Sequence, residues 1–178
     1  TQTSVPHIHA VGDVTTDICL VNVGELEGRH AVGCIFGGEC QPMRYQNVST
    51  IMFLAPEVAG VGMNELQAQK AGLAYRVAKY TYEYIPRAIA MRNQDGFFKI
   101  LVTDDDEMKV LGMRALGAHA SSTIMSVAML MELNQGIDLL ADLVHPHPSI
   151  PEGIQDCLRM LRGKSILKPE VFPALSCC

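Results

Sequence analysis

The chain has 178 residues, which is the length of one domain with an appendage. Hydrophobic residues make up 48% of it and charged residues 19%, a composition that excludes extended disorder. The net charge of -5, without a lysine and arginine cluster, argues against a nucleic-acid partner. No apolar run approaches the roughly 20 residues of a membrane helix, so we expect no membrane partner either.

The six cysteines are scattered along the chain and are too few for a disulfide scaffold. No secretory signal pattern opens the sequence. We therefore expect a cytoplasmic, reducing setting, in which Cys19, Cys34, Cys40 and Cys157 are small buried residues or inert thiols. The chain starts at Thr1, close to an apparent buried strand, so we also expect further sequence upstream.

The first expected elements are a strand at 7–11, HIHAV, that ends on Gly12 and Asp13, and then a helix. The glycines of this helix suit close packing. The run at 37–47 is rich in Gly, Pro and Asn, and we place a boundary or linker there. The apolar face of the helix is expected to contain Leu20, Val23, Leu26 and Ile35.

Short strands separated by turns follow the linker. Alternating runs at 49–55, 57–63 and 74–82 predict strands, and Asn64 with Gln67 predicts a brief capped helix between them. Two further alternating runs flank the acidic turn TDDDE and predict the clearest hairpin of the sequence.

Helix signals dominate the rest of the chain. Ser121 or Ser122 is expected to cap a helix that Gly136 ends. A short helix at 137–143 and a last one at 150–163 follow. The pattern predicts an α+β fold, a five-stranded antiparallel sheet with helices packed against it.

The segment HPHPSIPEG near the end of the chain concentrates groups that can carry chemistry. Pro148 and Pro151 favour a bend before a helix, so the imidazole of His147 and the carboxylate of Glu152 can meet across it. Such a contact would fix the tautomer of the imidazole and raise its basicity, as a general base requires. Ser149 followed by Glu152 is also a capping box, which needs no histidine. The spacing leaves both interpretations open.

A metal site is a third interpretation of this segment. His145 and His147 would bind the ion together with Asp142 or Cys157. No CxxC or HExxH pattern accompanies them, so we predict no metal there.

Two other places carry polar or reactive groups. Asp13 ends an expected strand, where an acid can bind a ligand hydroxyl, although aspartate is also a common helix cap. Cys177 and Cys178 form a terminal pair that can exchange a disulfide, hold a soft metal ion, or do nothing in a frayed tail.

Together these motifs resemble the carboxyl-terminal part of the pyridine nucleotide-disulfide oxidoreductases, the flavoprotein family that includes dihydrolipoamide dehydrogenase, glutathione reductase and mercuric reductase. TSVPHIHAVGD resembles the second FAD motif of the family, and APEVAGVGMNELQAQ resembles the start of its interface domain. GFFKILVTDDDEMKVLGMRALGAHASSTI resembles its central hairpin and helix, and HPHPSIPEG its HxHPTxxE signature. The resemblance implies a remnant of an α/β FAD domain at 1–40, a linker at 41–47, a dimerisation domain at 48–167 and a tail at 168–178.

The resemblance also implies roles for individual residues. Gly12 and Asp13 would bind FAD, Asp13 through the ribityl chain, and His147 with Glu152 would be an acid-base pair delivered across a homodimer. The amino-terminal FAD motif, the redox-active cysteine pair and the NAD(P) domain of the family do not occur in this sequence. We expect them in upstream domains of the same polypeptide, with this segment alone inactive and without bound cofactor.

The expected function is therefore that of the interface domain of an FAD- and NAD(P)-dependent reductase of a small disulfide or dithiol. A non-catalytic homodimerisation module is one alternative. A mercuric-ion reductase that uses Cys177 and Cys178 is another, because the tail LSCC resembles that of mercuric reductase.

Overall fold

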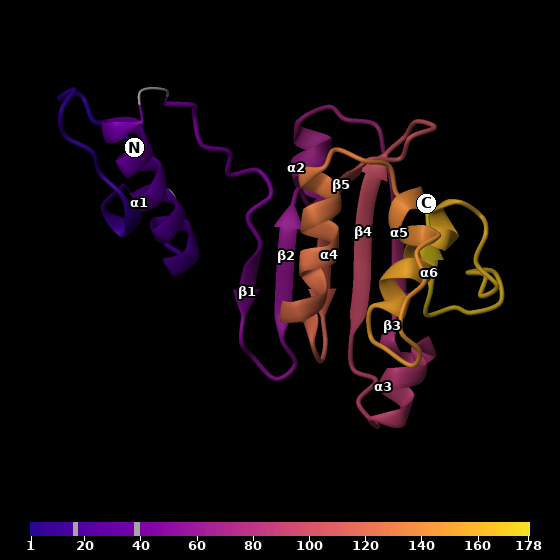
Figure 1. The fold of residues 1–178 in the computed structure, drawn as a ribbon. Helices are drawn as coiled ribbons and strands as arrows, with labels where there is room; N and C mark the ends of the chain where they lie inside the picture. Colours follow the sequence, from indigo (N-terminus) through magenta and orange to yellow (C-terminus); the bar gives the residue numbers. More distant parts are fainter. Residues whose placement is uncertain (16–17, 38–39) are drawn as a thin grey trace. The chain divides into compact units, whose positions relative to one another are not determined.

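The computed structural model describes residues 1–15, 18–37 and 40–178. The chain forms two compact units, Thr1–Tyr45 and Gln46–Cys178, each of which has its own internal packing (Figure 1). Among the helices of the described residues, none has both the length and the apolar character needed to cross a membrane.

The second unit is built on a single antiparallel sheet with the strand order β1-β2-β5-β4-β3-β6 (Figure 1). The first five strands are the predicted ones, and the α+β class is confirmed. The sequence pattern does not predict the short sixth strand, which pairs with β3. The strands are β1 Thr50–Met52, β2 Val58–Gly62, β3 Tyr75–Thr81, β4 Phe97–Thr103, β5 Val110–Leu116 and β6 Ser176–Cys177.

Alternating burial explains why these segments are strands. In β4, the side chains of Phe98, Ile100 and Val102 are fully buried on one face. Lys99 lies between them in sequence, points to the other face and forms an ion pair with Glu65. The sheet thus has an apolar face that must be covered by another layer.

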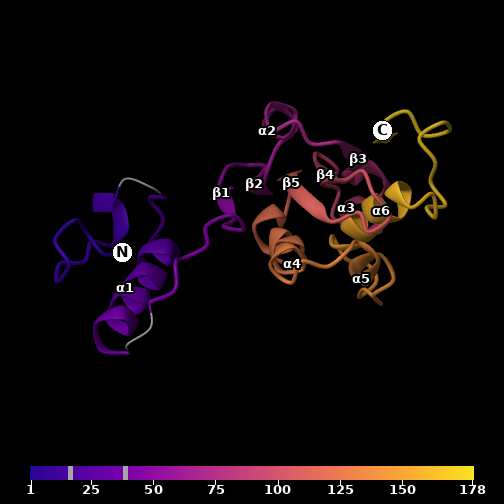
Figure 2. The ribbon, with the colours of Figure 1, turned by 90° about the horizontal axis from the view of Figure 1, so that it is seen from above.

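Helices form that covering layer. Helix α4 packs on β2 and β5, and α6 packs on β3 and β4. Both views place α4, α5 and α6 along one face of the sheet (Figures 1 and 2). The bounds are α2 Glu65–Lys70, α3 Pro86–Ala90, α4 Ala120–Glu132, α5 Asp138–Ala141 and α6 Glu152–Leu161.

Two helices of this unit are capped in different ways. At α2 the predicted capping box is confirmed, with Asn64 accepting from the backbone of Gln67 and the Gln67 side chain accepting from the backbone of Asn64. At α4 the carboxylate of Glu57 accepts the backbone N–H of Ser121 at 2.9 Å. His119, the residue before α4, makes no side-chain cap. The cap expected from a neighbouring serine is thus supplied by a residue far away in sequence.

The described residues of the first unit form the α-helix α1 Val21–Phe36 and a 3-10 turn at Gly12–Thr15. The strand expected at 7–11 is wrong. Among the described residues of this unit, a single antiparallel bridge between Gln2 and His9 stands in its place. Alternation of apolar residues makes a strand only where a partner strand pairs with it over several residues.

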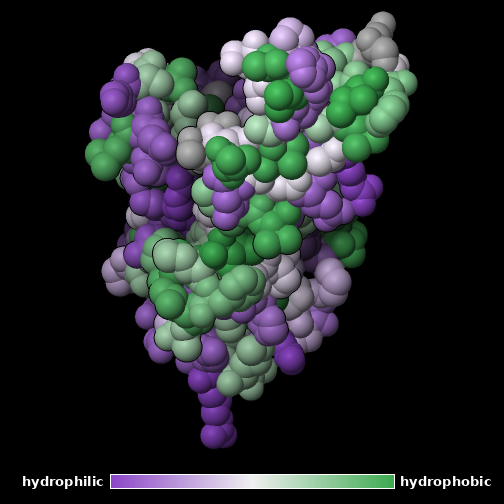
Figure 3. Space-filling view, turned by 90° about the vertical axis from the view of Figure 1, so that its left-hand side faces the viewer, coloured by the Kyte–Doolittle hydropathy of each residue, from purple (hydrophilic) through white to green (hydrophobic). Residues whose placement is uncertain are grey.

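Helix α1 buries only part of the face that was expected, since Val23 is buried as predicted but Leu26 and Ile35 are not. Its buried residues are Val23, Glu27 and Ala31, spaced four apart. Leu26 and Ile35, expected on the apolar face, are 56% and 53% exposed. Figure 3 shows green apolar surface scattered among purple polar surface on the face in view.

Candidate active site

His147 and Glu152 lie in contact. Nδ1 of the His147 ring is 2.8 Å from Oε1 of Glu152. An ionised carboxylate only accepts hydrogen bonds, so the ring proton in this contact is on Nδ1, and Nε2 carries the free lone pair of the neutral ring. The His147 side chain is 67% exposed and that of Glu152 19%. The imidazole is thus exposed to solvent, and the less exposed carboxylate of Glu152 holds it in place.

The same carboxylate also serves the start of α6. Its second oxygen, Oε2 of Glu152, accepts the backbone N–H of Ser149 at 2.6 Å. The hydroxyl of Ser149 is buried and has no hydrogen-bond partner among the described residues. Only one half of the capping box forms, and one carboxylate joins the helix start to the histidine.

The loop that carries His147 is fixed at both ends. Gln155, a buried residue of α6, donates its side-chain amide to the carbonyls of Ala141 and Leu143 at 3.0 and 2.5 Å. On the other side of the loop, Ile150 is only 4% exposed and belongs to the core. These anchors restrict the loop, so the exposed ring keeps its place above Glu152.

Gly153 explains how α6 comes close enough to the sheet. A Cβ atom at this position would lie 2.4 Å from Cδ1 of Ile85 and 3.1 Å from a ring carbon of Phe98. Both neighbours are buried core residues, so their side chains have no space in which to move away from such a Cβ atom. The glycine of HPHPSIPEG therefore has a packing role that places the helix start.

A partly buried polar pair lies one helical turn beyond Glu152. The hydroxyl of Tyr80 in β3 donates to Oδ2 of Asp156 in α6 at 3.2 Å. Burial raises the pKa of the Asp156 carboxyl, while the hydrogen bond from Tyr80 and the charge of Arg159 oppose that rise. Burial also raises the pKa of the Tyr80 phenol well above its usual range, so the phenol stays a donor. This pair fixes α6 on β3.

The donors of the histidine metal site do not converge. Nδ1 of His145 is 3.1 Å from the carbonyl oxygen of Leu143. The Cys157 thiol is fully buried and contacts the carbonyl of Ala78 at 3.4 Å. Burial raises the pKa of this thiol, which matches the expectation of an inert cysteine.

Gly12 and Asp13 lie on the 3-10 turn of the first unit. Gly12 has a φ of +72°, a conformation that favours glycine, and its N–H donates to Oε2 of Glu27 at 2.6 Å. A Cβ on Gly24 of α1 would lie 3.3 Å from Cα of Gly12, so the helix packs closely against this turn. Asp13 is exposed and accepts no hydrogen bond from the described residues.

The terminal cysteines are attached to the sheet. Cys177 is paired with Ala78 of β3, and the backbones of Val77 and Cys178 exchange hydrogen bonds of 2.8 and 2.9 Å. Burial raises the pKa of the Cys177 thiol, whereas Cys178 is exposed. The tail is therefore not frayed at its end.

A cysteine cluster in the first unit was missed from the sequence. Cys34 and Cys40 form a disulfide, and the ring of His30 lies beside it. The expectation of two inert thiols is wrong for this pair. The spacing of His30 and Cys34, one helical turn apart, is the only sequence signal that places them together.

Apolar side chains are exposed along the outer side of α4 and after α5. Met125, Met129 and Leu133 recur every four residues and are 63%, 56% and 55% exposed. Leu143 and Val144, which precede the histidine loop, are 53% and 92% exposed. Exposed apolar side chains at this helical spacing are typical of an association surface.

Comparison with known proteins gives a consistent match. Residues 48–157 match the family model described as the pyridine nucleotide-disulphide oxidoreductase dimerisation domain. The chain is 34% identical over 166 residues to the mitochondrial dihydrolipoyl dehydrogenase of Caenorhabditis elegans, covering 93% of this chain and 33% of the relative. It is 30% identical over 165 residues to the dihydrolipoyl dehydrogenase of Bacillus subtilis (strain 168), covering 93% and 35%.

Solved structures agree with this match. LpdA from Mycobacterium tuberculosis superposes with a TM-score of 0.82 at 26% identity, covering 89% of this chain and 34% of the other. The HOCl-induced flavoprotein disulfide reductase RclA from Escherichia coli superposes with a TM-score of 0.83 at 26% identity, covering 89% and 36%. The chain therefore spans about a third of the length of the relatives it matches.

Proposed function

The chain belongs to the pyridine nucleotide-disulfide oxidoreductase family, and from this premise we propose that it is the interface segment of a homodimeric, cytoplasmic flavoprotein disulfide reductase similar to dihydrolipoyl dehydrogenase. In the proposed enzyme His147, supported by Glu152, is the catalytic acid-base in the active site of the partner subunit. The supporting observation is an exposed imidazole held at 2.8 Å by a largely buried carboxylate.

The chemistry follows from the two nitrogens of the His147 ring. Nε2 takes the proton of a substrate thiol, and the resulting thiolate attacks a disulfide, displacing one of its sulfurs as a thiolate. The imidazolium then keeps two protons, one on Nε2 and one on Nδ1 facing Glu152, whose negative charge stabilises it. Nε2 returns its proton when a thiolate is protonated again, so the ring acts as acid and as base.

Gly12 and Asp13 fit one edge of FAD. The exposed Asp13 carboxylate is available to accept from hydroxyls such as those of the ribityl chain. No atom lies within 4 Å of a Cβ built on Gly12, which leaves room for a ligand to approach the backbone. When bound, FAD supplies the two-electron step between the disulfide and NAD(P). The sequence holds no GxGxxG, so we assign the rest of the FAD site and the NAD(P) site to upstream domains.

The homodimer is supported by the apolar surface of α4. Met125, Met129 and Leu133 form one exposed stripe, and Val144, which directly precedes the histidine loop in sequence, is exposed as well. Covering this surface with a second copy would bury apolar area and bring the His147 loop to the subunit boundary. Dimerisation and delivery of the histidine thus use the same side of the unit.

The terminal pair Cys177 and Cys178 gives weaker support for a function than His147 and Glu152 do. Cys177 is half-buried, its thiol has a raised pKa, and its backbone is committed to β3. A mercuric-ion reductase needs two accessible thiolates at this place. We therefore base the function on His147 and Glu152.

His147→Gln in the complete enzyme tests the proposal. We expect disulfide turnover to fall at least about a hundredfold, because His147 is the histidine of this loop whose ring is held by a carboxylate, with Nε2 left to take the thiol proton. His145→Gln is the matched control, since His145 contacts only the Leu143 carbonyl, and it should keep turnover within about twofold. Near-normal turnover of the His147 variant, with dimerisation intact, would instead support a non-catalytic homodimerisation module.

A further inference from the structure

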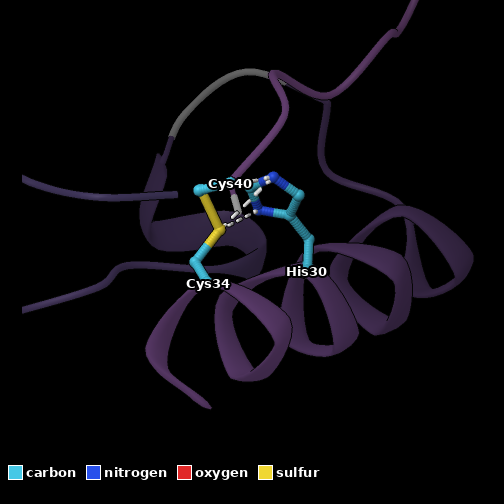
Figure 4. Close-up of side chains that lie close together, drawn as sticks. All are labelled: His30, Cys34 and Cys40. Carbon is cyan, nitrogen blue, oxygen red and sulfur yellow. Dashed lines mark hydrogen bonds between the residues drawn. A yellow bond between two sulfur atoms is a disulfide. The ribbon is translucent and has the colours of Figure 1, made fainter. Parts of the chain in front are cut away.

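A cluster of three ligand-type side chains lies in the first unit, which does not contain His147. His30 and Cys34 are on one face of α1, four residues apart, and Cys40 follows the helix (Figure 4). Their candidate ligand atoms all lie within 4.8 Å of one another. His30 and Cys34 are half-buried, whereas Cys40 is exposed, so the cluster is partly shielded but open on one side.

The distances suit a metal ion. Metal–sulfur and metal–nitrogen bonds of about 2.3 and 2.0 Å put the donors of a tetrahedral site about 3.5 to 3.8 Å apart. The Cys34 sulfur lies 3.6 Å from each nitrogen of the His30 ring, and the Cys40 sulfur lies 3.8 Å from Nε2. To reach this spacing, the two bonded sulfurs must move apart and the Cys40 side chain must shift from Nε2 toward Nδ1.

The His30 ring is held in a tautomer that can bind metal. Nε2 is 2.6 Å from the backbone carbonyl of Gln41, which can only accept, so Nε2 carries a proton and Nδ1 carries the lone pair. A metal-bound histidine commonly donates its other N–H to such a carbonyl. The hydroxyl of Thr1 lies 3.1 Å from this Nδ1 and equally close to Nδ1 of His9, so an ion bound to the His30 ring would displace this hydroxyl toward His9.

The disulfide determines whether the cluster can bind an ion. A sulfur in a disulfide has no proton to lose and is not a thiolate ligand. A small dithiol would break the Cys34–Cys40 bond, its two hydrogens moving to the two cysteines and its own sulfurs joining in a disulfide. A thiophilic ion would then displace the two cysteine protons.

From these observations we propose that Cys34, Cys40 and His30 form a redox-gated site for a soft divalent or monovalent cation of the Zn²⁺ or Cu⁺ class. The reduced form binds the ion through two thiolates and Nδ1, with a fourth position open to water or an external thiol. The disulfide form does not bind it. This site is separate from the proposed acid-base pair and does not depend on it.

Cobalt binding to the 178-residue chain tests the proposal. The chain carries Cys177→Ser and Cys178→Ser, which remove the other possible thiolate pair, and is studied both oxidised and after anaerobic reduction by a phosphine. Co²⁺, a spectroscopic substitute for Zn²⁺, should give one equivalent of thiolate charge-transfer absorption with the reduced chain only, and excess Zn²⁺ should remove it. Proton release of about two per ion should accompany binding.

Variants in the same background identify the ligands. Cys34→Ser and Cys40→Ser should each abolish the charge-transfer absorption, and His30→Ala should weaken Co²⁺ binding at least about tenfold. Cys19→Ser is the matched control, because Cys19 is an exposed free thiol of the same unit, and it should bind like the parent. Equal binding by oxidised and reduced chains, or undiminished absorption in Cys34→Ser, would overturn the proposal.

Discussion

Each of the two units of this chain is stabilised internally by different interactions. The unit Gln46–Cys178 has one continuous core of strand and helix side chains. In α1 of the unit Thr1–Tyr45, the buried residues are Val23, Glu27 and Ala31, and one of these is a carboxylate. That unit is tied instead by hydrogen bonds to Glu27 and by a disulfide. The proposed histidine site therefore lies on the unit that has a continuous apolar core. The first unit relies on polar and covalent links.

The largest expected effect comes from the core of the second unit. Phe98→Ala removes a fully buried ring between the sheet and α6, and should lower the free energy of unfolding by about 3 to 5 kcal/mol. The midpoint of denaturant unfolding followed by far-UV circular dichroism measures this. Phe53→Ala is the control, since Phe53 is 78% exposed, and should change stability by less than about 0.5 kcal/mol. Similar losses for both variants would mean that this core does not dominate stability.

A smaller effect is expected in the first unit. Glu27→Leu removes the acceptor of the half-buried N–H of Gly12 and one partner of the Tyr45 hydroxyl, which should cost about 1 to 3 kcal/mol. Amide hydrogen exchange should accelerate in α1 but not in β3 to β5. Glu25→Leu is the control, because Glu25 forms only an exposed pair with Arg29. Unchanged exchange in α1 would show that a buried carboxylate is not what holds this unit.

The smallest effect concerns the cap of α4. The backbone N–H of Ser121 lowers the pKa of Glu57 below its ordinary 4.5. A lowered folded-state pKa means that this contribution is complete above 4.5 and is lost as the pH falls through the folded value. Glu57→Gln should cost about 1 kcal/mol at neutral pH and should flatten the acid limb of the stability curve. An acid limb identical to that of the parent chain would exclude this role of Glu57.

Local patterns predict the second unit well. The alternation in β4 and the Asn64 capping box of α2 arise from interactions between near neighbours, which sequence patterns record. The cap of α4 comes from Glu57, and Asn134, with a φ of +51°, makes the turn that was expected of Gly136. Which residue caps α4 and which residue ends it depend on tertiary contacts and on small differences between adjacent residues.

The short β6 and the first unit were less predictable. β6 has two residues, too few for alternation, and its pairing with β3 is made by backbone groups. The disulfide of Cys34 and Cys40 requires knowing where the chain turns after α1.

The spacing of His147 and Glu152 in the sequence predicts part of the candidate site. The bend that Pro148 and Pro151 favour brings His147 and Glu152 to 2.8 Å, as the geometric argument predicts. The anchoring by Gln155, whose amide donates to Ala141 and Leu143, was not readable. Its partners lie at the end of α5 and just after it, and a glutamine in a helix gives no sign of them. The role of the pair in catalysis stays a prediction.

Mixed dimers of the complete enzyme would show whether His147 of one subunit serves the active site of the other, as we propose. One subunit carries His147→Gln, and the other lacks the redox-active cysteine pair expected in its upstream domains. Each homodimer should be inactive. Because one site of the mixed dimer would combine an intact cysteine pair with an intact histidine, we predict recovery of about half the parental turnover. A mixed dimer as inactive as the two homodimers would contradict the account.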